Sequence, residues 1–280
     1  MGILYIVATP IGNLEDISSR ALNVLQEVNY IACEDTRTSS VLLKHFNIDK
    51  RTVSYHKFNE KEKTYSIIND LLSGMSVALI SDAGCPCISD PGSILVHEAI
   101  LNNIEVISVP GASAITSSIM VSGMPSKSFA FYGFLDRENK KIEEELLRMK
   151  KDSCNIFVIY ESPKRIIKTL KKIEEVLNNP YICLCNDLTK KFEKKYYGDV
   201  SNVLKQLDSN PNKELGEYVL LIENPHIEEE KENISVEALI IDEMIKNNCT
   251  LKDAIKLVSV KYHYNKNIVY NASLNLKKMF

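Results

Sequence analysis

The first half of the chain alternates between short apolar runs and longer amphipathic segments, and this alternation constrains the fold more than any other feature. The apolar runs predict strands, and the segments between them have the apolar spacing of helices. Strands separated by helices of this length indicate parallel βαβ units, and almost wholly apolar strands indicate a sheet covered on both faces. The expected strands are residues 3–9, 30–34, 52–56, 76–81 and 104–110, and the expected helices are 17–28, 38–46, 63–74, 93–103 and 112–123.

The second half resumes the alternation and then changes character. The last three expected strands, 181–188, 193–200 and 216–223, lie too close together for a crossover helix at every step, which predicts a partly antiparallel sheet. A polar linker at 224–233 precedes three short helical patterns at 236–247, 251–262 and 266–279. The interruption MPSKS at 124–128 gives the first boundary. We therefore expect an N-terminal α/β domain (1–123), a second α/β domain with a mixed sheet (124–225), and a linker with a helical tail (226–280).

Composition excludes several classes of protein. The chain has 280 residues, of which 45% are hydrophobic, enough for one large or two medium domains. It has no apolar run long enough to span a membrane, and its N-terminus lacks the basic lead of a signal peptide, so we expect a soluble, cytoplasmic protein. The seven cysteines are odd in number and form no CxxC pair. This favours reduced thiols over disulfides, and we predict no metal site.

The net charge of −3 is unevenly distributed. Residues 226–245 contain seven acidic residues and one basic residue, whereas residues 246–280 contain seven basic residues and one acidic residue. The basic segment also contains Tyr262, Tyr264 and Tyr270. Lysines interleaved with aromatic side chains suit the binding of an RNA backbone, although the tyrosines could equally fill a small core while the lysines face solvent.

The loops that follow the first five strands are rich in small and polar residues. In an open α/β sheet, ligands bind beyond the carboxyl ends of the strands, so these loops are expected to form a site. They are TPIGNLED (9–16), EDTRTS (34–39), HKFNEKE (56–62), SDAGCPCISDPG (81–92) and PGASA (110–114).

The loop at 81–92 says most about the ligand. It has neither of the glycine-rich phosphate-binding patterns and no basic residue, and Asp82 and Asp90 would repel phosphate. A ligand with a cationic reacting end fits better, and S-adenosylmethionine has an ammonium, a sulfonium and no phosphate. The alternative is an ordinary turn and helix start, with Asp90 capping the next helix and Pro91 in its first turn.

Eight motifs in order make the chain similar to a known family. They are TPIGNLEDIS (9–18), ACEDTRTS (32–39), HKFNE (56–60), SDAGCPCISDPG (81–92), VPGASA (109–114), YGFL (132–135), YESPKR (160–165) and LTKKFE (188–193). Over about residues 3–225 the chain resembles the ribosomal RNA small-subunit methyltransferase I family, a branch of the tetrapyrrole methylase superfamily. The resemblance implies two α/β domains of the tetrapyrrole methylase type with the cofactor cleft between them, followed here by a small C-terminal helical segment.

The resemblance also implies an activity. It is S-adenosylmethionine-dependent 2′-O-methylation of a cytidine in the decoding centre of 16S ribosomal RNA, on the 30S subunit, by a homodimer. Some positions depart from the family pattern. Cys85 replaces the usual threonine and Cys87 a small or aliphatic residue, while Asn186 and Asp187 replace arginine and glutamate, and Leu215 replaces a basic residue.

Residue roles follow from the motifs and the expected strand ends. The expected cofactor-binding residues are Pro10, Gly12, Ser81, Asp82, Ala83, Gly84, Ser113, Ala114, Tyr160 and Leu188. The candidates for the catalytic base are Asp35, His56, Glu60 and Glu161. The expected RNA-binding residues are Arg37, Arg165, Lys190, Lys261 and Lys266.

Structural alternatives accompany these roles. Asp35 could pair with Arg37, Glu161 could cap the next helix, and Lys190 could belong to a solvated charged run. Two other functions also remain open: C-methylation of a tetrapyrrole, which PIGNLED (10–16) and the basic tail disfavour, and a non-catalytic role in ribosome assembly.

Overall fold

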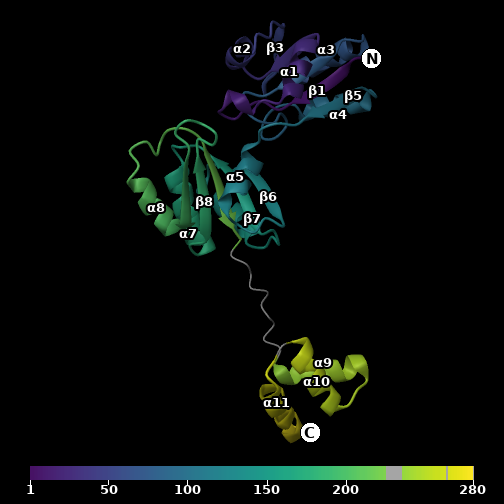
Figure 1. Cartoon of the computed structure of the whole chain (residues 1–280), viewed down its shortest axis with the longest axis vertical. Coiled ribbons are helices and arrows are strands. Elements are labelled where there is room, and N and C mark those ends of the chain that lie inside the picture. The colour runs from purple at the N-terminus through teal and green to yellow at the C-terminus, as the bar shows by residue number, and fades with distance from the viewer. Residues whose placement is uncertain (225–234, 263, 280) are drawn as a thin grey trace. The chain divides into compact units, whose positions relative to one another are not determined.

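The computed structural model describes residues 1–224, 235–262 and 264–279. The chain divides into two compact units, Met1–Pro225 and His226–Phe280. The larger unit contains two lobes, each built around a five-stranded sheet, and the smaller unit is made of helices (Figure 1). The predicted α/β class with a helical C-terminal segment is confirmed.

The first lobe has a wholly parallel sheet in the order β3-β2-β4-β1-β5. Its elements appear in the predicted alternation, with an additional 3-10 turn at Leu14–Asp16. The strands are β1 (Ile3–Val7), β2 (Tyr30–Cys33), β3 (Thr52–Ser54), β4 (Val77–Ile80) and β5 (Glu105–Val109), and the helices between them are α1 (Ser19–Glu27), α2 (Thr36–His45), α3 (Glu60–Leu72) and α4 (Ser93–Leu101).

Apolar side chains cover both faces of this sheet, which explains the unbroken apolar strands. On one face, Leu4 and Leu79 pack with residues of α3 and α4, such as Ile67 and Leu95. On the other face, strand residues such as Ile31 pack with residues of α1 and α2. Because the five strands are parallel, the loops that follow them all emerge at one edge of the sheet.

The second lobe has a mixed sheet in the order β6-β7-β10-β8-β9, in which only β6 and β7 are parallel. The predicted antiparallel character is confirmed. Its strands are β6 (Phe129–Phe134), β7 (Ile156–Glu161), β8 (Tyr181–Asn186), β9 (Lys194–Asp199) and β10 (Tyr218–Glu223). Helices α6 (Asn139–Met149), α7 (Ile166–Leu177) and α8 (Val200–Asp208) pack on one face.

Helix α5 (Ala114–Ser122) belongs by packing to the second lobe. Its residue Ile115 joins a buried cluster with Val158 and Leu221 of the second sheet, and the helix contacts β10. The predicted boundary after residue 123 leaves this helix in the first domain, but in the structure the chain passes to the second sheet before α5. The reason is that α5 covers the sheet face left open by α6, α7 and α8 (Figure 1).

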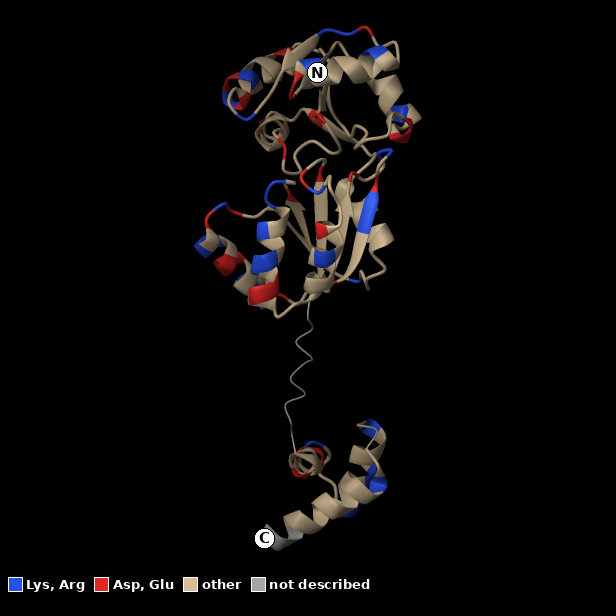
Figure 2. Cartoon of the chain, turned by 90° about the vertical axis from the view of Figure 1, so that its left-hand side faces the viewer, with Lys and Arg blue, Asp and Glu red and all other residues tan. Residues whose placement is uncertain are grey.

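The smaller unit contains the three predicted helices, α9 (Val236–Asn247), α10 (Leu251–Lys261) and α11 (Lys266–Met279). They share a core of seven buried apolar residues that includes Ile240, Val258 and Val269. Within the described residues, none of the helices has the length and apolar character that crossing a membrane requires. Charged residues lie mostly on helices and loops, whereas the strands are mainly uncharged (Figure 2).

Candidate active site

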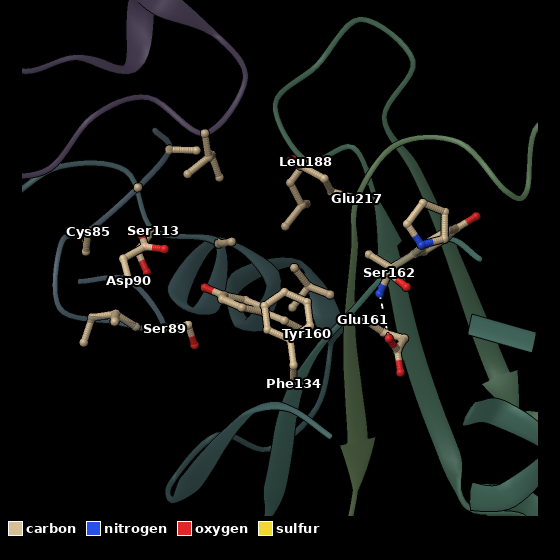
Figure 3. A pocket seen from close by; sticks show the side chains of 18 residues that line it. Cys85, Ser89, Asp90, Ser113, Phe134, Tyr160, Glu161, Ser162, Leu188 and Glu217 are labelled. Carbon is tan, nitrogen blue, oxygen red and sulfur yellow. Dashed lines mark hydrogen bonds between the residues drawn. The ribbon is translucent and has the colours of Figure 1, made fainter. Parts of the chain in front are cut away.

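A cavity of about 330 Å³ lies between the strand-end loops of the first lobe and the strand ends of the second. We call it the central cavity (Figure 3). This volume falls within the usual range for small-molecule sites, about 300 to 1,000 Å³. The lining residues are Ile11, Ala83, Gly84, Cys85, Ile88, Ser89, Asp90, Ser113, Ala114, Phe134, Tyr160, Glu161, Ser162, Pro163, Leu188, Glu217, Tyr218 and Val219.

The loop at 81–92 forms one wall of the central cavity and has an unusual backbone. Four of its residues have positive φ, namely Gly84 (76°), Cys87 (69°), Ser89 (63°) and Gly92 (140°). For non-glycine residues this conformation carries strain, which surrounding structure must hold in place. Gly84 is held by two backbone hydrogen bonds with Thr9, of 2.8 and 3.1 Å. The loop is therefore fixed in a conformation that its sequence alone would not favour.

Asp90 does not cap helix α4. The cap residue is Gly92, which makes no side-chain capping hydrogen bond, so the alternative in which Asp90 serves only as a helix cap is wrong. Gly92 cannot be replaced easily, because a Cβ there would lie 2.7 Å from Sγ of Cys87 and 2.8 Å from Cδ2 of Leu79. Asp90 instead lines the central cavity. In Figure 3 its side chain lies on the same wall as Cys85 and Ser113.

The electrostatic environment of Asp90 disfavours its charge. The pKa of Asp90 is raised to about 6, mainly by burial; the hydroxyl of Ser81 offsets part of this shift, and the charge of Asp82 adds to it. Burial also raises the pKa of Glu34, with Asp90 and Asp82 adding to the effect. This end of the cavity is therefore acidic, and none of the described residues that line the cavity is a lysine or an arginine.

The three carboxylates that line the cavity differ in their partners. Glu161 pairs with Arg165 through Nε at 3.3 Å, and Glu217 pairs with Lys190 at 2.9 Å. Among the residues that the structure describes, Asp90 forms no ion pair. A cationic ligand would supply the missing charge.

Strands β6 and β7 form the opposite wall with aromatic side chains. The hydroxyl end of Tyr160 points toward the loop that contains Asp90 (Figure 3). Burial raises the pKa of Tyr160 to about 12, and Cys85 and Asp90 add to the shift, so Tyr160 remains neutral near pH 7. Its ring meets Phe131 and Phe134 edge to face, with centroid separations of 4.8 and 5.7 Å.

Glu161 is held in a structural network behind this wall. Its buried carboxylate accepts hydrogen bonds from the backbone N–H of Ser162 at 2.7 Å and from Oγ1 of Thr169 at 2.6 Å. Nη2 of Arg165 donates to the carbonyls of Leu135 and Asp136. The network joins β7 to helix α7 and to the loop that follows β6.

The predicted cofactor-binding residues fall into two groups. Six line the central cavity: Ala83, Gly84, Ser113, Ala114, Tyr160 and Leu188. Four do not line it: Pro10, Gly12, Ser81 and Asp82. Of the latter, Ser81 is buried under the loop, and Asp82 is exposed and accepts a hydrogen bond from the backbone N–H of Asp35.

Gly12 serves the contact between the two lobes. A Cβ at this position would lie 2.5 Å from Cγ of Lys190 and 2.9 Å from Oγ1 of Thr189. The backbone N–H of the next residue, Asn13, donates to the same Thr189 hydroxyl at 3.1 Å. Glycine is needed here because the loop after β8 approaches so closely.

Three of the four candidate bases lie outside the central cavity. Asp35 forms hydrogen bonds with Arg37 that hold its pKa at about 2, which is the structural alternative raised from the sequence. Nδ1 of His56 accepts a hydrogen bond from the backbone N–H of Phe58. Glu60 accepts one from the hydroxyl of Tyr55. Glu161 lines the cavity but is occupied by the network described above.

Four of the five predicted RNA-binding cations already have carboxylate partners. Arg37 pairs with Asp35, Arg165 with Glu161, Lys190 with Asp187 and Glu217, and Lys261 with the buried Glu243. Lys266 is exposed on α11 and has no ion pair within the described part of the chain. Tyr262 donates to Glu243 and packs on the core of the small unit, whereas Tyr264 and Tyr270 are exposed.

The sequence reasoning did not assign Asp90, Phe134 or Glu217 to the site. Asp90 lies within the loop that was singled out, but its role depends on a backbone conformation that residue types do not reveal. Phe134 is the last residue of a strand within the motif YGFL, and its position at a strand end was the available signal.

Comparison with known proteins places this geometry in a family. The family "Tetrapyrrole (Corrin/Porphyrin) Methylases" matches residues 3–204. Solved structures of similar fold include a diphthine synthase (TM-score 0.63, 14% identity, 80% of this chain and 90% of that chain). The methyltransferase CobJ is another (TM-score 0.59, 15% identity, 80% and 95%). The expected fold type is confirmed.

Relatives of much higher identity share a single name. The chain is 40% identical over 274 residues to the Ribosomal RNA small subunit methyltransferase I of Pasteurella multocida (strain Pm70), covering 98% of this chain and 97% of the relative. It is 39% identical to the protein of that name in Bacillus subtilis (strain 168), covering 97% and 94%. The chain belongs to the tetrapyrrole methylase family and, within it, to the ribosomal RNA small subunit methyltransferase I group. The predicted resemblance is confirmed.

Proposed function

We propose that the protein transfers a methyl group from S-adenosylmethionine to the 2′-hydroxyl of a cytidine in 16S ribosomal RNA. The observation that carries this proposal is the carboxylate of Asp90, which lines the central cavity and forms no ion pair within the described residues, so that a cationic ligand fits there. Membership of the ribosomal RNA small subunit methyltransferase I group supports the RNA substrate.

The residues of the central cavity fit the cofactor. Asp90 offers a negative charge to an ammonium or a sulfonium group. The small residues Ala83, Gly84 and Ala114 leave the backbone accessible to a ligand that needs hydrogen bonds. Leu188 and Tyr160 provide apolar and aromatic surface for a nucleoside. Among the described residues, no lysine or arginine lines the cavity, so the cavity is poorly suited to a nucleotide phosphate.

The chain's own residues would orient the reactants and exclude water. When bound, S-adenosylmethionine would supply an electrophilic methyl group to a hydroxyl, whose proton passes to solvent. Asp90 would hold the cationic end of the donor, at its ammonium or its sulfonium group. Tyr160 and Phe134 cover the opposite side of the cavity and shield it from solvent. Alignment of donor and acceptor is the main demand of an in-line transfer.

A labelling experiment tests this function. The purified protein is incubated with methyl-labelled S-adenosylmethionine and 30S subunits that lack its modification, and the modified ribose is mapped by nuclease digestion. Label on a cytidine ribose of the decoding centre is expected. Label only on an added tetrapyrrole would favour C-methylation, and no label on either substrate would favour a non-catalytic assembly role.

We also propose that the helical unit contacts RNA. Lys252, Lys256 and Lys266 are exposed and form no ion pair within the described residues. Replacing either Lys252 or Lys256 by glutamine should weaken binding to 30S subunits and flatten its salt dependence, because fewer counterions are released. Lys246→Gln is the matched control, since Lys246 already pairs with Asp242 at 2.7 Å. Equal effects of this control and of either change would refute a specific RNA-binding role.

We propose that the enzyme acts in the cytoplasm as a homodimer. Met120 on α5 and Phe129 on β6 have exposed apolar side chains that a contact with a second protomer would cover. Light scattering of the purified protein measures the oligomeric state, and a monomeric mass at micromolar concentration would contradict the dimer.

A further inference from the structure

A second hollow, which we call the side cavity, adjoins the central cavity. It is more open, with a volume of about 680 Å³, and shares Phe134 and Ser162 with the central cavity. The residues that line it are Phe134, Leu135, Asp136, Arg137, Glu138, Ser162 and Arg165. A group held in the side cavity therefore lies next to whatever occupies the central cavity.

A β-bulge in β6 places Phe134 where the two cavities meet. Strand β6 pairs Phe131 with Val158 and Phe134 with Tyr160, so three steps along β6 correspond to two along β7. The extra residue is Tyr132, which has no partner on β7, and the residue after it, Gly133, has a φ of 65°. Without the bulge, Phe134 would lie on the opposite face of the sheet from Phe131, because side chains alternate along a strand. With it, both rings contact Tyr160.

Phe134 is fixed in place but uncovered. Its ring meets Tyr160 edge to face, at an interplanar angle of 63°, yet 57% of the residue is exposed. In Figure 3 its ring overlaps that of Tyr160, on the side of the cavity opposite Asp90. A large aromatic ring held at such a junction provides a flat surface that another ring can cover.

The floor of the side cavity is braced. Nη2 of Arg165 donates to the carbonyls of Leu135 and Asp136, at 2.9 and 2.7 Å, while its Nε contacts the buried Glu161. These contacts fix the loop after β6. Because the guanidinium of Arg165 already bonds to these protein groups, we treat Arg165 as a residue that positions this loop.

The charges at the rim favour an anion at one point. Lys141 lies 3.6 Å from Asp136 and 3.1 Å from Glu138 and offsets their carboxylates. Arg137, between them in sequence, is exposed and has no ion pair within the described residues. An RNA phosphate at the rim would meet this unpaired guanidinium.

We propose that the side cavity holds the target nucleoside, turned out of the RNA, with its base stacked on Phe134 and an adjacent phosphate at Arg137. This inference rests on the proposed RNA methylation. Proteins that act on a single nucleotide take it out of the stack, and unstacked bases commonly rest on aromatic side chains. With the base on Phe134, the ribose lies at the junction of the two cavities, where the methyl group must be delivered.

The test measures coupling between Phe134 and the base. Reconstituted 30S subunits contain either the normal nucleotide or an abasic ribose at the mapped position. Their dissociation constants are measured with the wild-type protein, Phe134→Leu and Phe134→Tyr in the presence of S-adenosylhomocysteine. The wild-type protein should prefer the normal subunit by about tenfold, Phe134→Leu should lose most of this preference, and Phe134→Tyr should retain it, as expected for base stacking on an aromatic ring.

The outcomes separate this inference from the proposed function. If Phe134→Leu weakens binding of normal and abasic subunits equally, the base does not stack on Phe134 and the inference fails, even where methylation is intact. If the wild-type protein methylates no ribose on normal subunits, the proposed function fails first. Because the coupling compares two RNAs on one variant, a general loss of folding or of cofactor affinity in that variant cancels.

The salt dependence of binding tests the proposed phosphate contact of Arg137. Arg137→Gln should weaken the binding of normal and abasic subunits by the same factor. It should also reduce by about 1 the slope of the logarithm of affinity against the logarithm of salt concentration. Arg148→Gln, at the other end of α6, is the charge-matched control and should leave the slope unchanged. An unchanged slope in Arg137→Gln would remove the phosphate contact from the proposal.

Discussion

Two of the three carboxylates that line the central cavity lie on opposite walls, and their surroundings differ. The loop wall carries Asp90, which lacks an ion pair among the described residues and has a pKa raised to about 6 by burial. The strand wall carries Glu161, which accepts two hydrogen bonds and pairs with Arg165. Both acids lie in motifs of the family, so their sequence context does not distinguish them.

The difference in partners indicates that one carboxylate stabilises the fold and the other binds a ligand. A buried acid whose partners lie within the protein stabilises the fold, and removing it leaves those partners unsatisfied. An acid without a partner costs stability in the free protein, and such groups concentrate at functional sites. Glu161 therefore belongs to the scaffold and Asp90 to ligand binding. Four changes test or refine this contrast, from the largest expected effect to the smallest.

The largest effect should come from Glu161→Ala. Its side chain has no exposed area, but that of Arg165 is 25% exposed, so water can rehydrate part of the lost pair. We expect the free energy of unfolding to fall by about 3 kcal/mol, at the lower end of the range for broken buried pairs. Urea denaturation measures it. Thr169→Val, which removes one hydrogen bond of the same network, should lower the free energy of unfolding by about 1 kcal/mol. A stable Glu161→Ala protein that fails only to bind cofactor would reverse the contrast.

Asp90→Asn should change the binding of S-adenosylmethionine more than the stability of the protein. We expect the affinity for S-adenosylmethionine to fall about 30-fold, or about 2 kcal/mol, because a charged partner is lost. The stability of the free protein should be unchanged or slightly higher. Calorimetry with S-adenosylhomocysteine, which lacks the sulfonium charge, refines the result. A smaller loss for this product places Asp90 near the sulfonium, and an equal loss places it near the ammonium. Wild-type affinity for both ligands would refute the assignment.

The pH dependence gives a third test. The pKa of Asp90 is raised in the folded protein, so between about pH 4 and 6 the folded state binds more protons than the unfolded state. In the free protein, this residue's contribution to stability should therefore decrease as pH rises through that window. Cofactor affinity should show the opposite trend, falling as pH drops below about 6 because protonation removes the charge. The Asp90→Asn protein should lose both trends, and a wild-type affinity that is flat from pH 7.5 to 5 would count against the proposed role.

The smallest effect concerns the strained backbone of the loop wall. Ser89 has a φ of 63°, which glycine adopts at no steric cost. Ser89→Gly should raise the free energy of unfolding by less than about 1 kcal/mol, because relief of strain exceeds the added entropy of the unfolded chain. Ser93→Gly, in the first turn of α4, is the control and should destabilise the protein. If both changes destabilise it equally, the conformation of Ser89 is not strained.

Most of the fold could be predicted from the sequence, because it depends on local patterns. The alternation of apolar runs and helices gave the five parallel strands of the first lobe, and the close spacing of 181–188, 193–200 and 216–223 gave the antiparallel part of the second. The three helices of the small unit followed from apolar spacing. Strand-end loops identified the region of the cavity, and six of the ten expected cofactor-binding residues line it.

The sequence by itself determined the class of fold, the loops that form the cavity and their acidic, lysine-poor chemistry, because these depend on residue type and order. The tertiary structure alone decided which acids are free. Glu217 finds its partner, Lys190, on a distant segment, and Asp90 faces the cavity from a loop in which four residues adopt positive φ and Gly84 is held by Thr9. It also decided the place of Phe134, because a single bulge changes the face on which a strand residue lies. Such features depend on contacts between distant segments, which no local pattern contains.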